Sequence, residues 1–301
     1  MDARQLRYFL AVVDAEGFGK AAEKLYIAQP SLSQAIAGLE RELGVALFHR
    51  VGRGVVLSDA GKQLIGPARQ VIRDLATAQA TIDAIKGVAR GRVEVTSMPS
   101  AGIEPLAPIM QRFAAAHPDV TVSVNAAFVP DEVIDAVRTG AVEIGLLGAP
   151  DIVRVAELDV VPLENQPLML FTAPGGPFHG RDHVTADDFD GHRLIASQPG
   201  SLMRQLVDHI LAQGSQARLV AEVAHRTSIL PLVLAGVADA ILPAAWKDLA
   251  IRAGADVLPI RPTAYLRIVL VSRRTQLTPA ARAFIDIARR YRDERLDQPA
   301  A

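Results

Sequence analysis

The chain has 301 residues, of which 50% are hydrophobic and 22% are charged. This length and composition allow two or three folded domains with sizeable cores. The chain has no cysteine, which excludes disulfides, thiolate metal sites, thiol nucleophiles and cysteine-based redox switches.

Charge is distributed unevenly along the chain. The 32 basic and 33 acidic side chains nearly cancel, but residues 1–90 hold 12 basic and 9 acidic ones, whereas residues 91–301 hold 20 and 24. The modest positive excess therefore lies in the first third of the chain, where it favours contact with phosphates. The N-terminus lacks the pattern of a signal peptide, and the apolar segment 229–246 is interrupted by prolines, a glycine and an aspartate. We therefore expect no membrane span and a cytoplasmic protein.

Residues 4–44 carry the most informative pattern. Residues 4–13 predict a supporting helix, and residues 20–44 predict two further helices joined by a tight turn at residues 26–28. The last helix has one apolar face, and Pro30 suits its first position. That face is formed by Leu32, Ile36, Leu39 and Leu43. This is the arrangement of a helix-turn-helix, over about residues 18–37, in which the start of the second helix enters a DNA groove.

The start of that helix is polar and lies mostly off the apolar face. Glutamine can pair bidentately with adenine, and serine can contact bases or phosphates. The residues expected to contact DNA are Gln29, Pro30, Ser31, Ser33 and Gln34. The alternative is an ordinary surface helix with a polar cap.

A short hairpin is predicted after Gly44. Apolar runs at residues 46–48 and 55–57 flank Arg50 and Arg53, which lie beside turn-forming glycines. We expect a wing whose arginines reach phosphates or a narrow minor groove. A solvated hairpin with incidental arginines is the alternative.

Residues 1–60 resemble the N-terminal domain of the LysR-type transcriptional regulators. The residues that carry the resemblance include Leu6-Arg7-Tyr8-Phe9, Ala21-Ala22, Leu25, Gln29-Pro30-Ser31-Leu32-Ser33, Leu39-Glu40, Leu43-Gly44, Leu47-Phe48 and Leu57-Ser58-Asp59-Ala60-Gly61. At Gln34 the family often carries arginine, so base preference is not transferable. The resemblance implies a sequence-specific regulator with an all-α winged helix-turn-helix domain at residues 1–58, acting at the nucleoid.

Residues 59–90 predict a long linker helix followed by a hinge. Its apolar residues repeat with steps of four and three, which is the pattern of a helix that packs lengthwise on another helix. The predicted dimer seam is Leu64, Ala68, Val71, Leu75, Ala78, Ile82 and Ile85. Packing within one chain is the alternative. The resemblance implies a homodimer on an interrupted palindrome of double-stranded DNA, a homotetramer, and RNA polymerase as a further partner.

From residue 92 short apolar strands alternate with helices, which favours parallel sheets covered by helices. Strands are predicted at residues 92–98, 120–125, 144–148, 168–173, 193–197, 218–223, 240–243 and 265–272. Helices are predicted near residues 103–116, 131–139, 202–213, 228–236 and 279–294. By resemblance, residues 91–301 form a two-lobed α/β effector domain like the periplasmic binding proteins. Lobe I would hold about residues 91–163 and 266–295, and lobe II about 164–265, with crossovers near 163–167 and 262–267.

Ligands of such sheets bind beyond the carboxyl ends of the strands. Three polar segments there precede predicted helices, at residues 97–100, 197–201 and 225–228, and each could seat a carboxylate or another anion. The expected effector contacts are Met98, Ser100, Phe128, Ser197, Ser201 and Thr227. For the serines, simple helix capping is the alternative.

These patterns predict a transcriptional regulator that responds to a small-molecule effector between two lobes. No nucleophile–base pair, metal-ligand cluster or phosphate loop is recognisable, so we expect no enzyme, no metal and no cofactor besides the effector. A solute-binding-like protein and an effector-independent regulator are the alternatives.

Overall fold

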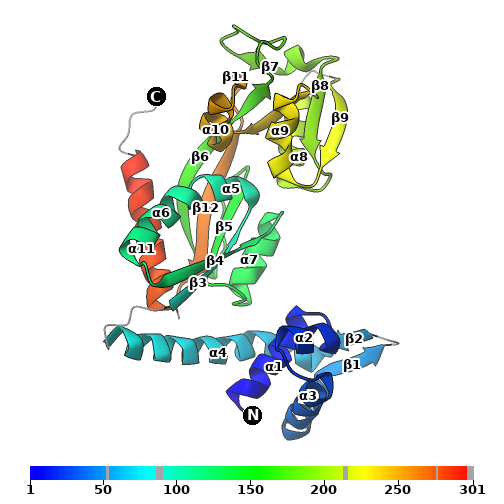
Figure 1. Cartoon of the computed structure of the whole chain (residues 1–301), viewed down its shortest axis with the longest axis vertical. Coiled ribbons are helices and arrows are strands. Elements are labelled where there is room, and N and C mark those ends of the chain that lie inside the picture. Colours follow the sequence, from blue (N-terminus) through cyan, green and yellow to red (C-terminus); the bar gives the residue numbers. More distant parts are fainter. Residues whose placement is uncertain (52–53, 86–90, 213–215, 276, 297–301) are drawn as a thin grey trace. The chain divides into compact units, whose positions relative to one another are not determined.

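The computed structural model describes residues 1–51, 54–85, 91–212, 216–275 and 277–296. Two compact units divide these residues, one formed mainly before residue 86 and the other mainly after residue 90. Figure 1 labels most of the helices and strands of both units. No helix within the described ranges is long and apolar enough to cross a membrane.

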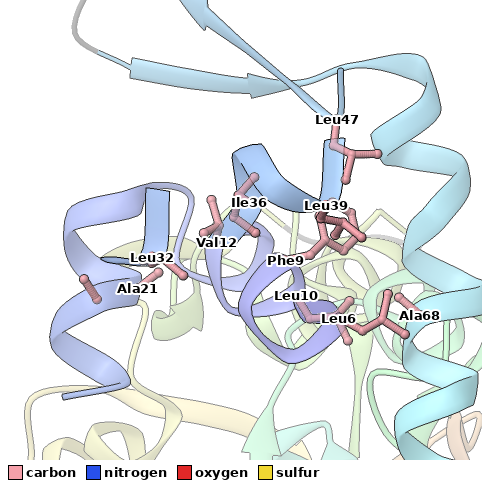
Figure 2. Close-up of a cluster of buried hydrophobic side chains, with 11 residues drawn as sticks. Leu6, Phe9, Leu10, Val12, Ala21, Leu32, Ile36, Leu39, Leu47 and Ala68 are labelled. Atoms are coloured by element: carbon pink, nitrogen blue, oxygen red, sulfur yellow. The ribbon is translucent and has the colours of Figure 1, made fainter. Parts of the chain in front are cut away.

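The first unit consists of three short helices, a hairpin and one long helix. Their bounds are α1 (Ala3–Asp14), α2 (Phe18–Lys24), α3 (Gln29–Leu43), β1 (Phe48–Val51), β2 (Gly54–Leu57) and α4 (Asp59–Ile85). Leu6, Phe9 and Leu39 meet in one apolar core, where each is at most 2% exposed. Figure 2 shows this core, to which α1, α2, α3 and α4 all contribute.

Local signals place the ends of these helices. The Asp2 carboxylate accepts the backbone N–H of Gln5, and the Gln5 side chain accepts that of Asp2, which forms a capping box at α1. Helix α3 ends at Gly44, whose φ of 72° is left-handed. It begins at Gln29, so Pro30 is its second residue rather than its first. Pro30 still leaves no intrahelical hydrogen bond unmade, because the first four N–H groups have no partner within a helix.

The second unit contains two lobes. The sheet of the first lobe has the order β4-β3-β5-β12-β6, and helices cover both of its faces, with α6 and α11 on one side and α7 on the other (Figure 1). Its elements are β3 (Gly91–Ser97), α5 (Pro99–Ile103), α6 (Leu106–Ala116), β4 (Val120–Ala126), α7 (Pro130–Arg138), β5 (Ile144–Ala149), β6 (Leu158–Thr172), β12 (Tyr265–Arg273) and α11 (Pro279–Leu296).

The sheet of the second lobe has the order β6-β10-β8-β9, with β11 on the other side of β6 and β7 beside β11. Its elements are β7 (Val184–Thr185), η1 (Ala186–Phe189), β8 (Arg193–Ser197), α8 (Leu202–Leu211), β9 (Arg218–Val223), η2 (Arg226–Ser228), α9 (Ile229–Leu234), β10 (Asp239–Pro243), η3 (Ala244–Trp246), α10 (Lys247–Arg252) and β11 (Asp256–Arg261).

The expectation of parallel sheets is only partly correct. β3 is parallel to β4 and β5, and β8 is parallel to β9 and β10. However, β12 is antiparallel to β5 and β6, and β10 is antiparallel to β6. Both sheets are therefore mixed, because a strand that passes from one lobe to the other runs against its neighbours.

Strand β6 is longer than predicted. The sequence indicated a strand at 168–173 after a crossover at 163–167, but one strand runs from Leu158 to Thr172. Its first part, up to Pro167, pairs with β12, and its last part, from Leu168, pairs with β10 and β11. The strand itself is therefore the connection between the lobes.

Other boundaries also differ from prediction. The helix expected near 103–116 is α6, which begins at Leu106, and a separate short helix, α5, precedes it and ends before Glu104-Pro105. Proline disfavours helical backbone in the residue before it, which accounts for the break. Strands β7 and β11 and helix α10 were missed, since elements this short show too few repeats of an apolar pattern to be recognised.

Candidate DNA-binding surface and inter-lobe site

The first turn of α3 presents polar side chains to solvent. Gln29, Pro30, Ser31 and Gln34 are exposed, and Ser33 is half-buried. On the opposite face, Leu32, Ile36 and Leu39 are at most 2% exposed. The expected contact residues of the helix therefore lie together on one outer surface, which the buried face holds firmly against α1 and α2 (Figure 2).

A side chain that sequence reasoning gave no role fixes the wing to this helix. The Glu40 carboxylate of α3 accepts the backbone N–H groups of Leu47, at 2.7 Å, and of Phe48, at 3.1 Å. Ser58 anchors the other end of the hairpin. Its hydroxyl donates to the carbonyl of Ala46 at 2.6 Å and accepts the N–H of Gly61 at 2.9 Å. Such contacts hold the wing and the recognition helix in one rigid arrangement.

Strands β1 and β2 form the predicted antiparallel hairpin, in which Arg50 pairs with Val55. The side chain of Arg50 lies outside what the structure describes, as does Arg53 as a whole. Their contact with DNA therefore remains a prediction.

The heptad residues of α4 divide into two groups. Ala68 is 1% exposed and lies in the core of its own chain, and Leu64 packs against the same core. Further along the helix, Val71 is 41%, Leu75 46% and Ile82 48% exposed. Ala78 is exposed too, and the side chain of Ile85 lies outside the described part. The exposed part of the heptad stripe therefore begins at Val71, because α1 packs against the first turns of α4.

In the second unit, the expected effector contacts follow the carboxyl ends of parallel strands. Met98 and Ser100 follow β3, and Phe128 follows β4 in the first lobe. In the second lobe, Ser197 ends β8 and Thr227 follows β9. This is the edge at which ligands of open α/β sheets bind.

Several of these residues have structural roles. Met98 is 2% exposed, and its sulfur accepts the N–H of Gly148 at 3.4 Å, so it offers no surface to a ligand. Ser201 caps α8, because its hydroxyl accepts the N–H of Arg204 and donates to the carbonyl of Gln198. Phe128 and Thr227 are exposed.

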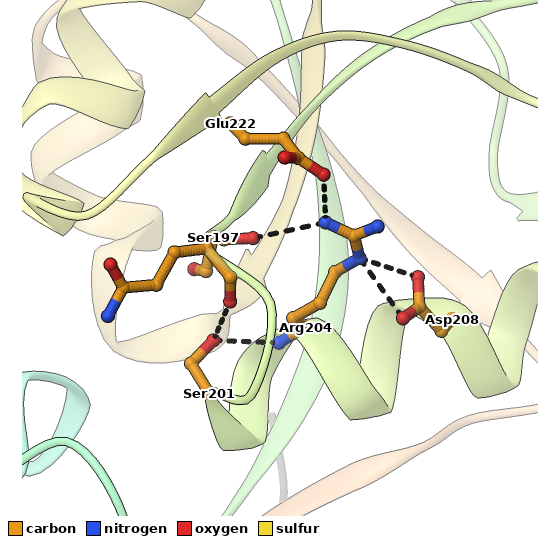
Figure 3. A network of polar contacts seen from close by, with 6 residues as sticks. Ser197, Ser201, Arg204, Asp208 and Glu222 are labelled. Atoms are coloured by element: carbon orange, nitrogen blue, oxygen red, sulfur yellow. Dashed lines mark hydrogen bonds and ion pairs between the residues drawn. The ribbon is translucent and has the colours of Figure 1, made fainter.

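The Arg204 guanidinium completes a polar network around this cap (Figure 3). It binds the carboxylates of Glu222 and Asp208 and, at 3.5 Å, the carbonyl oxygen of Ser197. These hydrogen bonds raise the pKa of Arg204, that from Glu222 most. The network holds the loop after β8 to α8. The charge of Arg204 is neutralised within it.

A second arginine of the same lobe, Arg226, lacks carboxylate partners among the residues that the structure describes. Arg226 is 5% exposed, and its Nη1 donates to the hydroxyl of Ser100 in the other lobe at 2.9 Å. Its buried Nη2 has no hydrogen-bond partner among the described residues. Burial lowers the pKa of Arg226 to about 10, so the group stays charged at neutral pH. Sequence reasoning chose Thr227 here, since nothing in the local pattern shows which of two neighbours turns inward.

The lobes also touch around this bond. Ile103 of α5 packs against the core of the second lobe, which includes Trp246 of η3. Ser100 and Arg226 therefore meet where α5 closes against that lobe. Of the expected effector contacts, the described hydrogen bonds bring Ser100 alone to the opposite lobe.

Two family models match this chain. Residues 3–62 match the bacterial regulatory helix-turn-helix protein of the lysR family, and residues 86–293 match the LysR substrate binding domain. A curated relative is the HTH-type transcriptional regulator IlvR of Caulobacter vibrioides, 30% identical over 95% of this chain and 96% of the relative. The chain belongs to the LysR family of bacterial transcriptional regulators.

Solved structures have the same fold along nearly the whole chain. A full-length OxyR variant from Pseudomonas aeruginosa matches with a TM-score of 0.72 at 21% identity, covering 97% of this chain and 94% of that one. Full-length CbnR in complex with its target DNA matches with a TM-score of 0.65 at 23% identity, covering 97% of this chain and 100% of that one. The protein is a DNA-binding transcriptional regulator with a helix-turn-helix domain and a two-lobed effector-binding domain.

Proposed function

We propose that the first turn of α3 reads bases in the major groove while the wing contacts the backbone or the minor groove. The observation that carries this proposal is the exposed polar turn on a helix whose opposite face is fully buried. Gln29 and Gln34 supply the side chains suited to adenine, and Ser31 and Ser33 supply hydroxyls. The domain responsible would be residues 1–58.

Two protomers pair through α4 in this proposal. Val71, Leu75 and Ile82 form an exposed apolar stripe on α4, and a second copy of the same helix would cover it. Pairing places two reading heads on an interrupted palindrome. The proposal also includes a homotetramer formed through the second units, and a contact with RNA polymerase. The regulator would act at the nucleoid.

The second unit, residues 91–301, transmits the signal. Its two lobes share the continuous strand β6 and meet through α5, so a ligand that prefers one lobe arrangement shifts the population toward it. The effector would bind between Ser100 of the first lobe and the loops after β8 and β9 of the second. No catalytic step is part of this proposal.

Selection of genomic DNA fragments on the purified protein, followed by sequencing, tests the reading head. The test variant is Gln29→Ala with Gln34→Ala, and the control is Gln205→Ala, a glutamine of α8 that is also exposed. We expect enrichment of an interrupted palindrome by the wild type and the control, with lower enrichment or altered sequence in the double variant. Equal enrichment of the same sequence by all three proteins would contradict base reading by α3.

Repeating the selection at two salt concentrations separates the two kinds of contact. Phosphate contacts weaken steeply with salt and carry little sequence information, whereas base contacts define the motif. We expect the double variant to keep the salt dependence of the wild type while losing its motif.

A further inference from the structure

Between the lobes lies a buried cation, Arg226, for which the described residues supply no counter-ion. Arg226 is 5% exposed, its one recorded hydrogen bond goes to a neutral hydroxyl, and its Nη2 lacks a partner in the described part of the chain. Burial is the only cause of its lowered pKa, so no described carboxylate compensates the charge. A buried charge that is unpaired destabilises a fold, and such groups in ligand sites commonly await a partner.

The neighbouring arginine shows that this arrangement is specific. Arg204 lies in the same lobe but is satisfied by two carboxylates, Asp208 and Glu222 (Figure 3). The second lobe therefore neutralises Arg204, which supports the loop after β8. Its described residues leave the charge of Arg226, which faces the other lobe, uncompensated. Arg226 follows β9 at the carboxyl edge of the parallel strands, where a ligand would approach.

We propose that the effector of this regulator is a small organic carboxylate, which Arg226 binds between the lobes together with the Ser100 hydroxyl. The inference rests on the proposed role of the second unit as the effector-binding domain. A guanidinium presents two parallel N–H groups that match the two oxygens of a carboxylate. The carboxylate would satisfy Nη2 and neutralise the charge, and the Ser100 hydroxyl would hold the same group from the first lobe.

The same geometry gives the ligand a way to change the protein. Without an anion, the guanidinium contributes to the contact between the lobes, among the described residues, through its hydrogen bond to Ser100. With a carboxylate bound, both lobes contact the ligand. The binding energy therefore stabilises the arrangement of the lobes in which Arg226 and Ser100 both reach the carboxylate. The charged end of the effector thus acts on the lobe interface itself.

Two substitutions separate an anion site from a simple latch between lobes. Arg226→Met removes the charge and the guanidinium but keeps an unbranched apolar stem, and Ser100→Ala removes only the hydroxyl. If the Arg226–Ser100 bond serves as a latch, both variants lower the unfolding midpoint of the full-length protein. If Arg226 awaits an anion, Arg226→Met raises the midpoint by about 3 °C, because an uncompensated buried charge is replaced by an apolar group. Ser100→Ala then lowers it, because the guanidinium loses its remaining partner.

The probes are three acids and their matched amides: propionate and propionamide, succinate and succinamide, and phenylacetate and phenylacetamide. Unfolding midpoints are measured at constant ionic strength for the wild type, both variants and the control Arg252→Gln, an exposed arginine of the same lobe. We expect acids to protect the wild type and the control more than amides do, to keep only part of this advantage in Ser100→Ala, and to lose it in Arg226→Met. A fall in the midpoint of Arg226→Met, equal protection by acids and amides, or protection that survives in Arg226→Met overturns the proposal.

The selection of genomic DNA, repeated with Arg226→Met, separates this inference from the proposed function. If Arg226→Met enriches the same motif as the wild type but shows none of the expected anion effects, the carboxylate assignment fails and DNA reading stands. If neither protein enriches a motif, the proposed function fails while the stability measurements still decide on the anion site.

Discussion

Replacement of Leu75 by lysine is the most direct test of pairing through α4. Leu75 is 46% exposed in the protomer and lies between Val71 and Ile82 on the same stripe. Lysine keeps the helix intact, since both residues are good helix formers. The fold of one chain should therefore be unaffected, while an interface between two copies should lose an apolar contact and gain a charge.

The exposures give the size of the effect. Full burial of a leucine or isoleucine side chain stabilises by about 1.5–3 kcal/mol, so covering the exposed half of Leu75 is worth about 1 kcal/mol per chain. Removing this contribution from both chains costs about 2 kcal/mol, which weakens the dimer by about 30-fold. Desolvation of the two ammonium groups adds to the loss, to the extent that they cannot reach solvent.

Sedimentation velocity over a range of concentrations measures the dimer dissociation constant. The control is Ala76→Lys, because Ala76 is also exposed but lies about 100° around the helix from Leu75. We expect Leu75→Lys to weaken association, Ala76→Lys to leave it unchanged, and both to unfold at the wild-type temperature. Equal dissociation constants for Leu75→Lys and wild type, or an equal loss in Ala76→Lys, would refute pairing through this stripe.

Three further predictions concern the stability of the two units. Gly61→Ala should destabilise the first unit by about 1–3 kcal/mol in thermal unfolding, because a Cβ would overlap the carbonyl oxygen of Leu47, although alanine normally favours a helix. Glu40→Gln should cost about 1–3 kcal/mol, because the amide is a weaker acceptor for the N–H of Leu47. Asp188→Asn should cost about 1 kcal/mol at pH 7, since the N–H of Thr185 and a nearby guanidinium hold the pKa of Asp188 below its usual 3.8.

The pH dependence of the last variant follows from the direction of that shift. A carboxylate with a lowered pKa contributes stability above pH 3.8, and this contribution is lost as the pH falls through the folded pKa. The wild type should therefore lose its advantage over Asp188→Asn in acid, and an advantage that persists there would contradict this cause.

For the first unit, Gly66→Ala is the control, since the space around Gly66 is open. A loss in Gly66→Ala as large as in Gly61→Ala would remove the steric explanation.

The helix-turn-helix was accessible from sequence because its signals are local. Apolar spacing placed Leu32, Ile36 and Leu39 on one face, and all three are buried. Glu40 was part of the recognised pattern, but its role was not, because its partners Leu47 and Phe48 come into reach only when the chain turns back along α3.

The heptad pattern of α4 is compatible with two kinds of packing. The same spacing describes a face that packs on its own domain and one that packs on another chain. Ala68 is buried by its own core, whereas Leu75 is left open. Which residues of α4 are buried depends on how far along α4 the contact with α1 extends. The spacing of apolar residues within α4 does not show this.

The sequence by itself determined the class of protein, the reading helix with its polar first turn, and the alternating elements of the second unit, because these depend on periodicity and on residues close together in the chain. The tertiary structure alone decided which groups meet across the lobes. Ser100 and Arg226 are 126 positions apart, and only the packing of α5 against the second lobe makes Arg226 a buried cation with one neutral partner. The chemistry of the proposed effector site rests on burial and on which groups the described residues leave unpaired, which are properties of the folded chain.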